Sequence, residues 1–343
     1  MYSEYYKLSG KPFQLSPNPR FYFGSRGHQK ALAYLQYGLH QAEGFIVVTG
    51  DVGTGKTTLL GYLLGQLDSA KYLTAKLVTT QLEADDTLRM VATAFGIDTR
   101  GVDKATLLRT FERFLLDNQR RGRRVLVLVD EVQNLPIKSL EELRMLSNFQ
   151  ANDAAPLQFC LMGQPQFQQM IASDDLMQLR QRVIASYHLG PLNPDETRSY
   201  IEHRLHLVDW RSDPLLTDGA YERIHHYTGG VPRRINVLCD RLFLGAMLEE
   251  LHEITDQVVE GVAGEMSNEG TSSVREIAGN RPMKREIAPV EANTPNTGEL
   301  ERRLASLEKL VNVHDRTIKR AIELASDYLN GDAAVESRGK LKS

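Results

Sequence analysis

Eight residues near the start of the chain have the types and spacing needed to hold phosphate groups. Residues 50–57 read GDVGTGKT, a complete G-x-x-x-x-G-K-[ST] pattern. Its glycines permit the positive φ angles with which successive backbone N–H groups turn toward phosphate oxygens. In such a loop Lys56 reaches the β- and γ-phosphates, and Thr57 binds Mg²⁺. We therefore predict a nucleotide site formed by Gly50, Asp51, Val52, Gly53, Thr54, Gly55, Lys56, Thr57 and Thr58.

The residues on both sides of this pattern have the periodicity that it requires. Residues 45–49, FIVVT, form a short apolar run typical of a buried strand, and residues 58–64, TLLGYLL, continue as a helix. A helix that starts at the loop also offers the positive end of its dipole to an anion. This context favours a phosphate site over a chance match to the pattern.

Two adjacent carboxylates end a second apolar run. Residues 125–129, VLVLV, are apolar without alternation, which suits a strand buried on both faces of a parallel sheet, and Asp130 and Glu131 follow directly. Asp130 would hold the Mg²⁺ ion, and Glu131 would orient or deprotonate the water that attacks the γ-phosphate. The alternative is a strand that ends in a solvated acidic turn, which the nearby phosphate-loop pattern makes less favourable.

A polar side chain also ends the run at residues 156–162, PLQFCLM, which is followed by Gly163 and Gln164. If this strand lies beside the acidic pair, Gln164 could sense the γ-phosphate or hold the attacking water. Alternatively, Gln164 is an ordinary turn residue.

Three arginines are candidates for contacts with phosphate. Arg180 and Arg182 precede the run at residues 185–189, at a position where ring-forming ATPases project an arginine onto the neighbouring subunit's γ-phosphate. We favour Arg182 because it is nearer the strand, although either arginine could instead form a surface salt bridge. Arg233 follows a Gly-Gly helix end and Pro232, so it starts a helix and could swing over the phosphates, coupling the nucleotide to lid position.

The composition limits the classes of protein that the chain can belong to. The formal net charge of −3 and pI near 6.3 indicate no global attraction to nucleic acid or anionic membrane. The two cysteines lack CxxC spacing, which favours buried reduced thiols in a cytoplasmic protein. No apolar run is long enough to cross a bilayer, and the N-terminus does not resemble a signal peptide. Membrane attachment is therefore expected only through a partner.

The pattern along the chain predicts five successive parts. Residues 1–43 are an aromatic, proline-rich lead and a helix, and residues 44–192 alternate strands with helices, which indicates a parallel sheet covered on both faces. Residues 193–266 are predicted to be a small all-α lid, and residues 267–297 a disordered linker. The predicted strands span 45–49, 72–79, 125–129, 157–162 and 185–189.

The last predicted part is a helix over residues 298–330 with a heptad seam. Apolar residues recur there at 4,3 spacing, interrupted by His314. The pattern favours a coiled coil or a helix docked on a partner; the alternative is an amphipathic helix that folds back on the preceding domains. The seam comprises Leu300, Leu304, Leu307, Val311, His314, Ile318, Ala321, Ala325 and Tyr328.

Seven ordered segments of residues 1–265 resemble one known family. They are YYKLSGKPFQLSPNPRFYF, GFIVVTGDVGTGKTTL, LVDEVQNLPIKSLEELRMLSNFQ, CLMGQPQF, LRQRV, ETRSYIEHRL and GGVPRRINVLCDRLFLGA. They are similar to AAA+ ATPases of the ExeA/GspA (general secretion pathway protein A, MshM-like) family. Within that family, FGSRGHQKALAYLQYGLHQAEGF and ELERRLASLEKLVNVHDRTIKRAIELA are most similar to the ATPases associated with exosortase (XrtA/PEP-CTERM) systems.

The resemblance implies a P-loop NTPase (AAA+) α/β fold with a lid and the hydrolysis of ATP with Mg²⁺. It also implies a homo-oligomer, such as a ring, and a protein partner in a bacterial envelope export, secretion or exopolysaccharide system. The protein would then be cytoplasmic, or peripheral at the inner membrane through that partner. The family's nucleotide site maps onto residues 50–57, Asp130, Glu131, Gln164 and Arg233. Long family members continue into a membrane helix and a peptidoglycan-binding region, whereas here only a linker and a heptad helix follow.

Two other functions share some of these features. A DNA-binding AAA+ regulator of the transposition type has the same motifs, but residues 1–43 carry five basic and two acidic side chains, a modest net of +3 for a DNA channel. A small-molecule kinase would need neither a partner arginine nor the lid arginine Arg233. For the adenine base, the expected contacts are Pro12 and Phe13 of the N-terminal lead.

Overall fold

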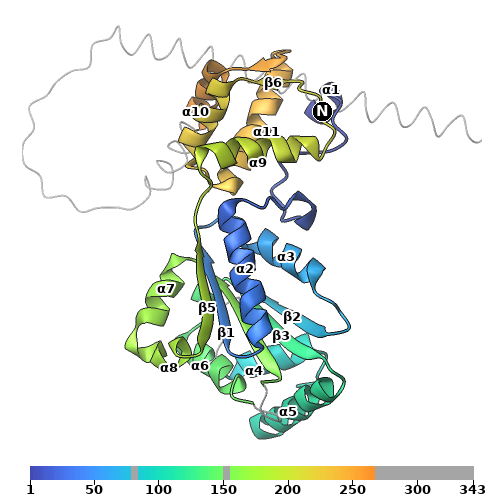
Figure 1. Ribbon diagram of the computed structural model, residues 1–343, viewed down its shortest axis with the longest axis vertical. Helices are drawn as coiled ribbons and strands as arrows, with labels where there is room; N and C mark the ends of the chain where they lie inside the picture. The colour runs from blue at the N-terminus through green and yellow to red at the C-terminus, as the bar shows by residue number, and fades with distance from the viewer. Residues whose placement is uncertain (79–83, 150–154, 267–343) are drawn as a thin grey trace, which may run out of the picture. The chain divides into compact units, whose positions relative to one another are not determined.

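Five parallel strands form the central sheet of the protein, in the order β2-β3-β4-β1-β5. The computed structural model describes residues 1–78, 84–149 and 155–266, and these residues belong to one compact unit (Figure 1). Each pair of neighbouring strands runs in parallel register. The α/β sheet predicted from the alternating strands and helices is therefore confirmed.

The elements have the following bounds. The strands are β1 (Phe45–Gly50), β2 (Tyr72–Val78), β3 (Arg124–Asp130), β4 (Leu157–Gly163), β5 (Val183–Leu189), β6 (Leu215–Leu216) and β7 (Glu253–Ile254). The helices are α1 (Tyr2–Tyr5), α2 (Arg26–Gln41), α3 (Lys56–Gln66), α4 (Ala84–Ala94), α5 (Lys104–Arg120), α6 (Ile137–Leu146), α7 (Pro165–Ala172), α8 (Met177–Arg180), α9 (Pro194–His206), α10 (Asp218–Thr228) and α11 (Pro232–Leu248). Short 3₁₀ turns are η1 (Pro19–Phe21), η2 (Val132–Asn134) and η3 (Asp174–Leu176). Residues 256–266 are also helical.

The inner strands are apolar on both faces because helices cover both sides of the sheet. Every residue of β1 and β4 is buried. Alternate β1 residues divide between two clusters: Ile46 and Val48 pack with side chains of α2 and α3, whereas Phe45 and Val47 pack with side chains of α4 to α8. Unbroken apolar runs are what this double burial requires.

Side-chain caps fix the starts of α2, which packs on the sheet, and of α9, the first helix after β5. The Ser25 hydroxyl accepts the His28 N–H at the start of α2. At the start of α9, Asn193 and Glu196 form a capping box, each side chain accepting the other residue's backbone N–H. Such reciprocal caps satisfy N–H groups that a helix start leaves without partners.

The first residues of the chain pack into the lid, which we define as residues 193–266. Tyr2, Tyr6 and Phe13 belong to the lid's apolar core, where the rings of Phe13 and Phe243 have centroids 5.4 Å apart. The predicted segment of residues 1–43 therefore divides, because α2 packs on the sheet instead. The lid also contains the parallel pair β6–β7, a difference from the purely helical pattern predicted for it.

Three further sequence predictions concern the two cysteines, the segments after residue 266 and membrane-spanning helices. Cys160 and Cys239 are both buried free thiols, as predicted. The predicted linker at 267–297 and the heptad helix at 298–330 lie outside the described residues. Among the described helices, none combines the length and apolar character needed to span a bilayer.

Two helical glycines test how closely α2 packs on the sheet. A Cβ atom at Gly38 would lie 2.5 Å from Cγ1 of Ile46, whereas a Cβ at Gly65 in α3 would meet nothing within 4 Å. Gly38→Ala should therefore lower the free energy of unfolding by about 1–3 kcal/mol through overpacking. Gly65→Ala, the matched control, should raise it by about 0.5–1 kcal/mol because alanine favours helix. Urea unfolding of both variants measures the difference, and equal effects would contradict the close packing.

Candidate nucleotide site

The phosphate-loop pattern lies at the carboxyl edge of the sheet, between the end of β1 and the start of α3. Gly53 and Gly55 have φ angles of 88° and 99°, in the left-handed region that glycine adopts without strain. A Cβ on Gly53 would also lie 2.5 Å from Cβ of Arg233 in the lid. The loop thus needs glycine both for its curl and for the close approach of α11.

The Lys56 ammonium is held above the loop by two backbone carbonyls. Its Nζ donates to the oxygens of Gly50, at 2.6 Å, and Asp51, at 2.9 Å. Burial lowers the pKa of Lys56, and the carboxylates of Glu131 and Asp130 act in the opposite direction. A phosphate oxygen could replace these carbonyls as the partner of the ammonium.

Two oxygen-bearing side chains converge next to the loop. The Thr57 hydroxyl donates to Oδ2 of the buried Asp130 across 3.3 Å. The Lys76 ammonium lies 3.2 Å from the same oxygen, because β2 is the neighbour of β3 and pairs Val78 with Asp130. Sequence reasoning missed Lys76, since the order of strands in the sheet, on which this contact depends, cannot be deduced from the spacing of motifs.

Two glutamine amides hold the side chain of Glu131. Nε2 of Gln133 and Nε2 of Gln164 both donate to Glu131 Oε2, at 2.6 Å and 3.0 Å. Gln133 Oε1 in turn accepts the backbone N–H of Gln164 at 2.9 Å. The structure thus brings Gln164 to Glu131, as expected if β4 lies beside β3. It also brings Gln133 to Glu131, a contact that sequence reasoning missed. The position of Gln133 two residues after Glu131 is the feature of the sequence that could have indicated it.

The backbone of Glu131 is itself unusual. Its φ of 53° lies in the left-handed region, which is uncommon for a residue other than glycine. Residues held in such conformations concentrate at functional sites. Together with the two amide contacts, this conformation fixes the position of the Glu131 carboxylate at the carboxyl edge of the sheet.

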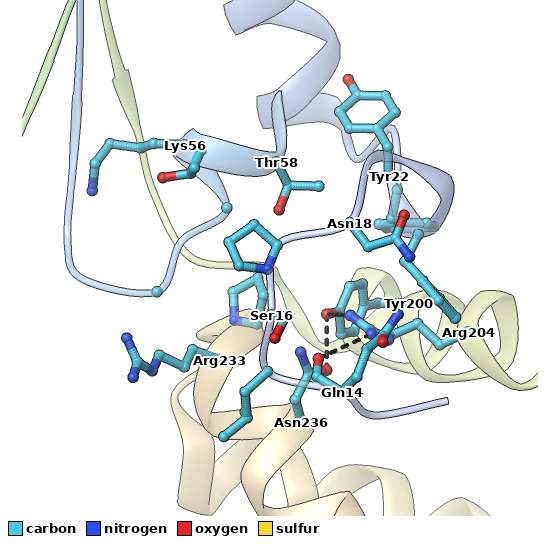
Figure 2. A pocket seen from close by; sticks show the side chains of 18 of the residues that line it. Gln14, Ser16, Asn18, Tyr22, Lys56, Thr58, Tyr200, Arg204, Arg233 and Asn236 are labelled. Atoms are coloured by element: carbon cyan, nitrogen blue, oxygen red, sulfur yellow. Dashed lines mark hydrogen bonds between the residues drawn. The ribbon is translucent and has the colours of Figure 1, made fainter. Parts of the chain in front are cut away.

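Arg233 brings the lid to the phosphate loop. Its backbone N–H donates to the Gly53 carbonyl at 3.1 Å, and its side chain is exposed at the start of α11. In Figure 2, Arg233 and Lys56 lie on the same side of a pocket between the loop and the lid. The predicted residues that line this pocket are Val52, Gly53, Gly55, Lys56, Thr57, Thr58, Glu131 and Arg233.

A connected polar cluster forms the other end of the pocket (Figure 2). Arg204 donates to the Tyr200 hydroxyl at 2.8 Å and to the Pro12 carbonyl at 2.6 Å. The Tyr200 hydroxyl donates to Oδ1 of Asn236 at 2.9 Å. These lid residues come from α9 and α11 and had no signal in the sequence, because each lies in an otherwise ordinary amphipathic helix.

The expected contacts of the adenine base with Pro12 and Phe13 are wrong. Phe13 is 1% exposed in the lid core, and neither residue lines the pocket. Residues 14–18 line it instead. The Phe13 ring packs edge-on against the ring of Phe243 in α11.

Arg180 and Arg182 lie away from the pocket, near the opposite edge of the sheet. The Arg182 carbonyl accepts the N–H of Phe45 at the start of β1, and its Nη1 is 3.3 Å from both the carbonyl and hydroxyl oxygens of Ser147. Arg180 is exposed and donates to the Ala172 carbonyl at 2.8 Å. Within one chain, neither arginine joins the site.

Comparison with known proteins identifies the domain that carries this site. A family model described as an AAA domain matches residues 39–171. The chain is 38% identical over 275 residues to General secretion pathway protein A of Aeromonas hydrophila; the alignment covers 79% of this chain and 50% of that protein. The chain therefore spans about half the length of this curated relative.

Two solved structures share the fold. The ORC2 protein of Aeropyrum pernix, in its ADPNP–ADP complexes, is 18% identical with a TM-score of 0.54, over 70% of this chain and 66% of that one. CDC6P from Pyrobaculum aerophilum is 15% identical with a TM-score of 0.58, over 75% of this chain and 71% of that one. The matched family model, the parallel sheet and these neighbours show that the protein has the P-loop AAA+ fold.

Proposed function

We propose that the protein binds ATP with Mg²⁺ and hydrolyses the terminal phosphoanhydride bond. The observation that carries this proposal is the convergence of three kinds of group at one sheet edge. The curled loop with Lys56 suits phosphates, Thr57 and Asp130 offer oxygens 3.3 Å apart, and Glu131 provides a positioned carboxylate. This combination matches the requirements of phosphoryl transfer, which depends on positioning and charge stabilisation.

The residues at the Asp130 end fit a magnesium ion. Mg²⁺ prefers oxygen ligands and usually keeps several waters beside one or two protein groups. The Thr57 hydroxyl and the Asp130 carboxylate provide such a pair. The ion pair of this carboxylate with the Lys76 ammonium indicates that a cation is stabilised there. When bound, Mg²⁺ would neutralise charge on the β- and γ-phosphate oxygens.

The remaining groups of the site act on the phosphates and the attacking water. The loop N–H groups and Lys56 bind phosphate oxygens, and the Glu131 carboxylate accepts a proton from water. Gln164 and Gln133 hold this carboxylate through its Oε2 atom, so their amides set its direction. Gln164 would also sense the γ-phosphate, because it directly follows β4 and contacts this acid.

Arg233 and a second subunit complete the proposed cycle. Arg233 is exposed next to the loop, so its guanidinium can reach the phosphates and draw the lid onto them. An arginine near the start of β5 acts in trans in a homo-oligomer: Arg182 is favoured by its position, and Arg180 by its exposure. Hydrolysis then releases the lid and changes the contacts that the protein makes with its partner.

The cellular role that we propose is in a bacterial envelope export or secretion system, including systems that link exopolysaccharides with exosortases. The support is the 38% identity to a protein named General secretion pathway protein A, together with the quoted segments. The protein would act in the cytoplasm or at the inner membrane through a protein partner. Residues 298–330, outside the described structure, are proposed to link subunits or dock on that partner.

Replacing the proposed general base tests the chemistry. Glu131→Gln should keep ATP affinity within a few fold and lower turnover by about 10²–10⁴-fold, because the amide accepts no proton. Lys56→Ala should instead lose nucleotide binding. Phosphate release and fluorescent-nucleotide titration measure the two effects. Hydrolysis at the original rate by Glu131→Gln would contradict the assigned role.

Mixing variants tests the arginine in trans. Arg182→Ala and Arg180→Ala should be compared, and loss of the true trans arginine should lower hydrolysis by about 10³-fold while nucleotide binding persists. Adding Glu131→Gln protein to that variant should restore partial activity, because some mixed interfaces then contain an intact Glu131 and an intact arginine. If neither arginine variant loses activity, or if the inactive one is never rescued, the site does not require a neighbour.

Neutralising Lys76 tests the magnesium site without measuring turnover. Lys76→Met removes a cation that competes with Mg²⁺ for Asp130, so half-saturating Mg²⁺ in ADP binding should fall about two- to fivefold. Lys71→Met is the matched control, since Lys71 pairs with an exposed Asp68 outside the site. A rise in the Mg²⁺ requirement for Lys76→Met would indicate that Lys76 holds phosphate instead.

A further inference from the structure

The polar cluster at the lid end of the pocket leaves one hydrogen-bond donor for a ligand. Asn236 follows Arg233 by one helical turn of α11, and both residues line the pocket (Figure 2). Asn236 is buried, with 7% of its surface exposed. Its Oδ1 atom accepts the Tyr200 hydroxyl, whereas its Nδ2 atom has no hydrogen-bond partner among the described residues. Because buried amides normally have partners, these N–H groups are available to a molecule in the pocket.

Arg204 sets the direction in which this amide points. A guanidinium donates hydrogen bonds and accepts none, so the Tyr200 oxygen accepts the Arg204 Nη1 proton at 2.8 Å. The Tyr200 hydroxyl in turn donates its own proton to Oδ1 of Asn236 at 2.9 Å. Arg204 is itself held by the carbonyls of Pro12 and Gln14, at 2.6 Å and 3.3 Å. The amide oxygen therefore faces Tyr200, and the amide nitrogen is the atom left for a ligand.

The position of Asn236 in the pocket favours the base of a nucleotide over its phosphates. The phosphates would lie at the loop beside Lys56, and the polar cluster forms the other end of the pocket (Figure 2). Phe21 and Phe23 also line the pocket and pack against this cluster, with the Phe21 ring centroid 4.5 Å from the guanidinium carbon of Arg204. A planar base has apolar faces that suit aromatic side chains and a polar edge that suits an amide.

We propose that Asn236 recognises the nucleobase by donating a hydrogen bond from Nδ2 to an unprotonated ring nitrogen, and that Arg204 and Tyr200 are positioning residues that hold its amide in this direction. This proposal rests on the proposed nucleotide-binding function. A donor at this place suits the unprotonated ring nitrogens of adenine. A base with an N–H group at the same place would be disfavoured, because two donors would face each other without an acceptor.

Analogues of ADP in which C–H replaces one ring nitrogen test the contact directly. Competition with a fluorescent ADP labelled on its ribose gives the affinity of the full-length protein for ADP and for its deaza analogues at N1, N3 and N7. At least one analogue should bind about three- to tenfold more weakly than ADP, because it lacks the acceptor. Asn236→Leu should bind ADP as weakly as it binds this analogue, since the donor is then absent.

Two controls separate recognition of the base from the folding of the lid. Inorganic tripolyphosphate has no base, so Asn236→Leu should bind it within about twofold of the original protein. Tyr200→Phe removes the hydroxyl that orients the amide and should lower the affinity ratio of ADP to the discriminating analogue at least about twofold. Tyr221→Phe is the matched control and should leave this ratio unchanged: Tyr221 is also a buried lid tyrosine beside an arginine, and it does not line this pocket.

The contrary outcomes are distinct. Equal binding of ADP and all three analogues by the original protein would overturn the inference, and this measurement needs no variant that folds. Selectivity that persists in Asn236→Leu would place the contact on another residue, which also overturns it. If the analogues bind alike but 2′-deoxy-ADP binds more weakly than ADP in the original protein alone, Asn236 contacts the ribose and the proposal is wrong. Failure of the original protein to bind either ADP or tripolyphosphate would overturn the proposed function and this inference with it.

Discussion

Double burial of the central strands is the constraint on which the rest of the structure depends. Within β1, β3 and β4 the buried side chains are mostly apolar, and Gln158 of β4 is buried with its amide donating to the Gly38 and Glu43 carbonyls. The polar groups of the candidate site lie where these strands end. In a parallel sheet those ends share one edge, and the phosphate loop, Asp130, Glu131 and Gln164 therefore meet although they are distant in sequence.

The phosphate loop is held by contacts from three directions. Gly53 allows Arg233 of the lid to approach, and Gly55 leaves space for the ring of His28. The Lys56 ammonium donates hydrogen bonds to two backbone carbonyls of the loop. A side chain at either glycine would separate these elements. The glycines therefore determine both the shape of the loop and the distance between the loop and its neighbours.

The sequence was sufficient to predict the parallel sheet and the candidate residues that depend on local pattern. The apolar runs marked the strands because double burial removes alternation, and the motif at residues 50–57 marked the loop. The contacts of Lys76 and His28 could not be predicted, since each depends on which elements become neighbours in space. The placement of Phe13 was wrong for a related reason: nothing local distinguishes an aromatic residue that packs in a lid core from one that stacks on a base.

The division of the N-terminal segment has a mechanical consequence. Tyr2, Tyr6, Leu8 and Phe13 belong to the lid core, α2 lies on the sheet, and the chain returns to the lid after β5. The polypeptide therefore passes between the two parts twice, near residues 22–25 and again near residues 190–193. Two connections along the chain restrict where the lid can lie against the sheet more than a single connection would. The first of these passages borders the pocket, so a nucleotide bound there would lie beside one of the two connections.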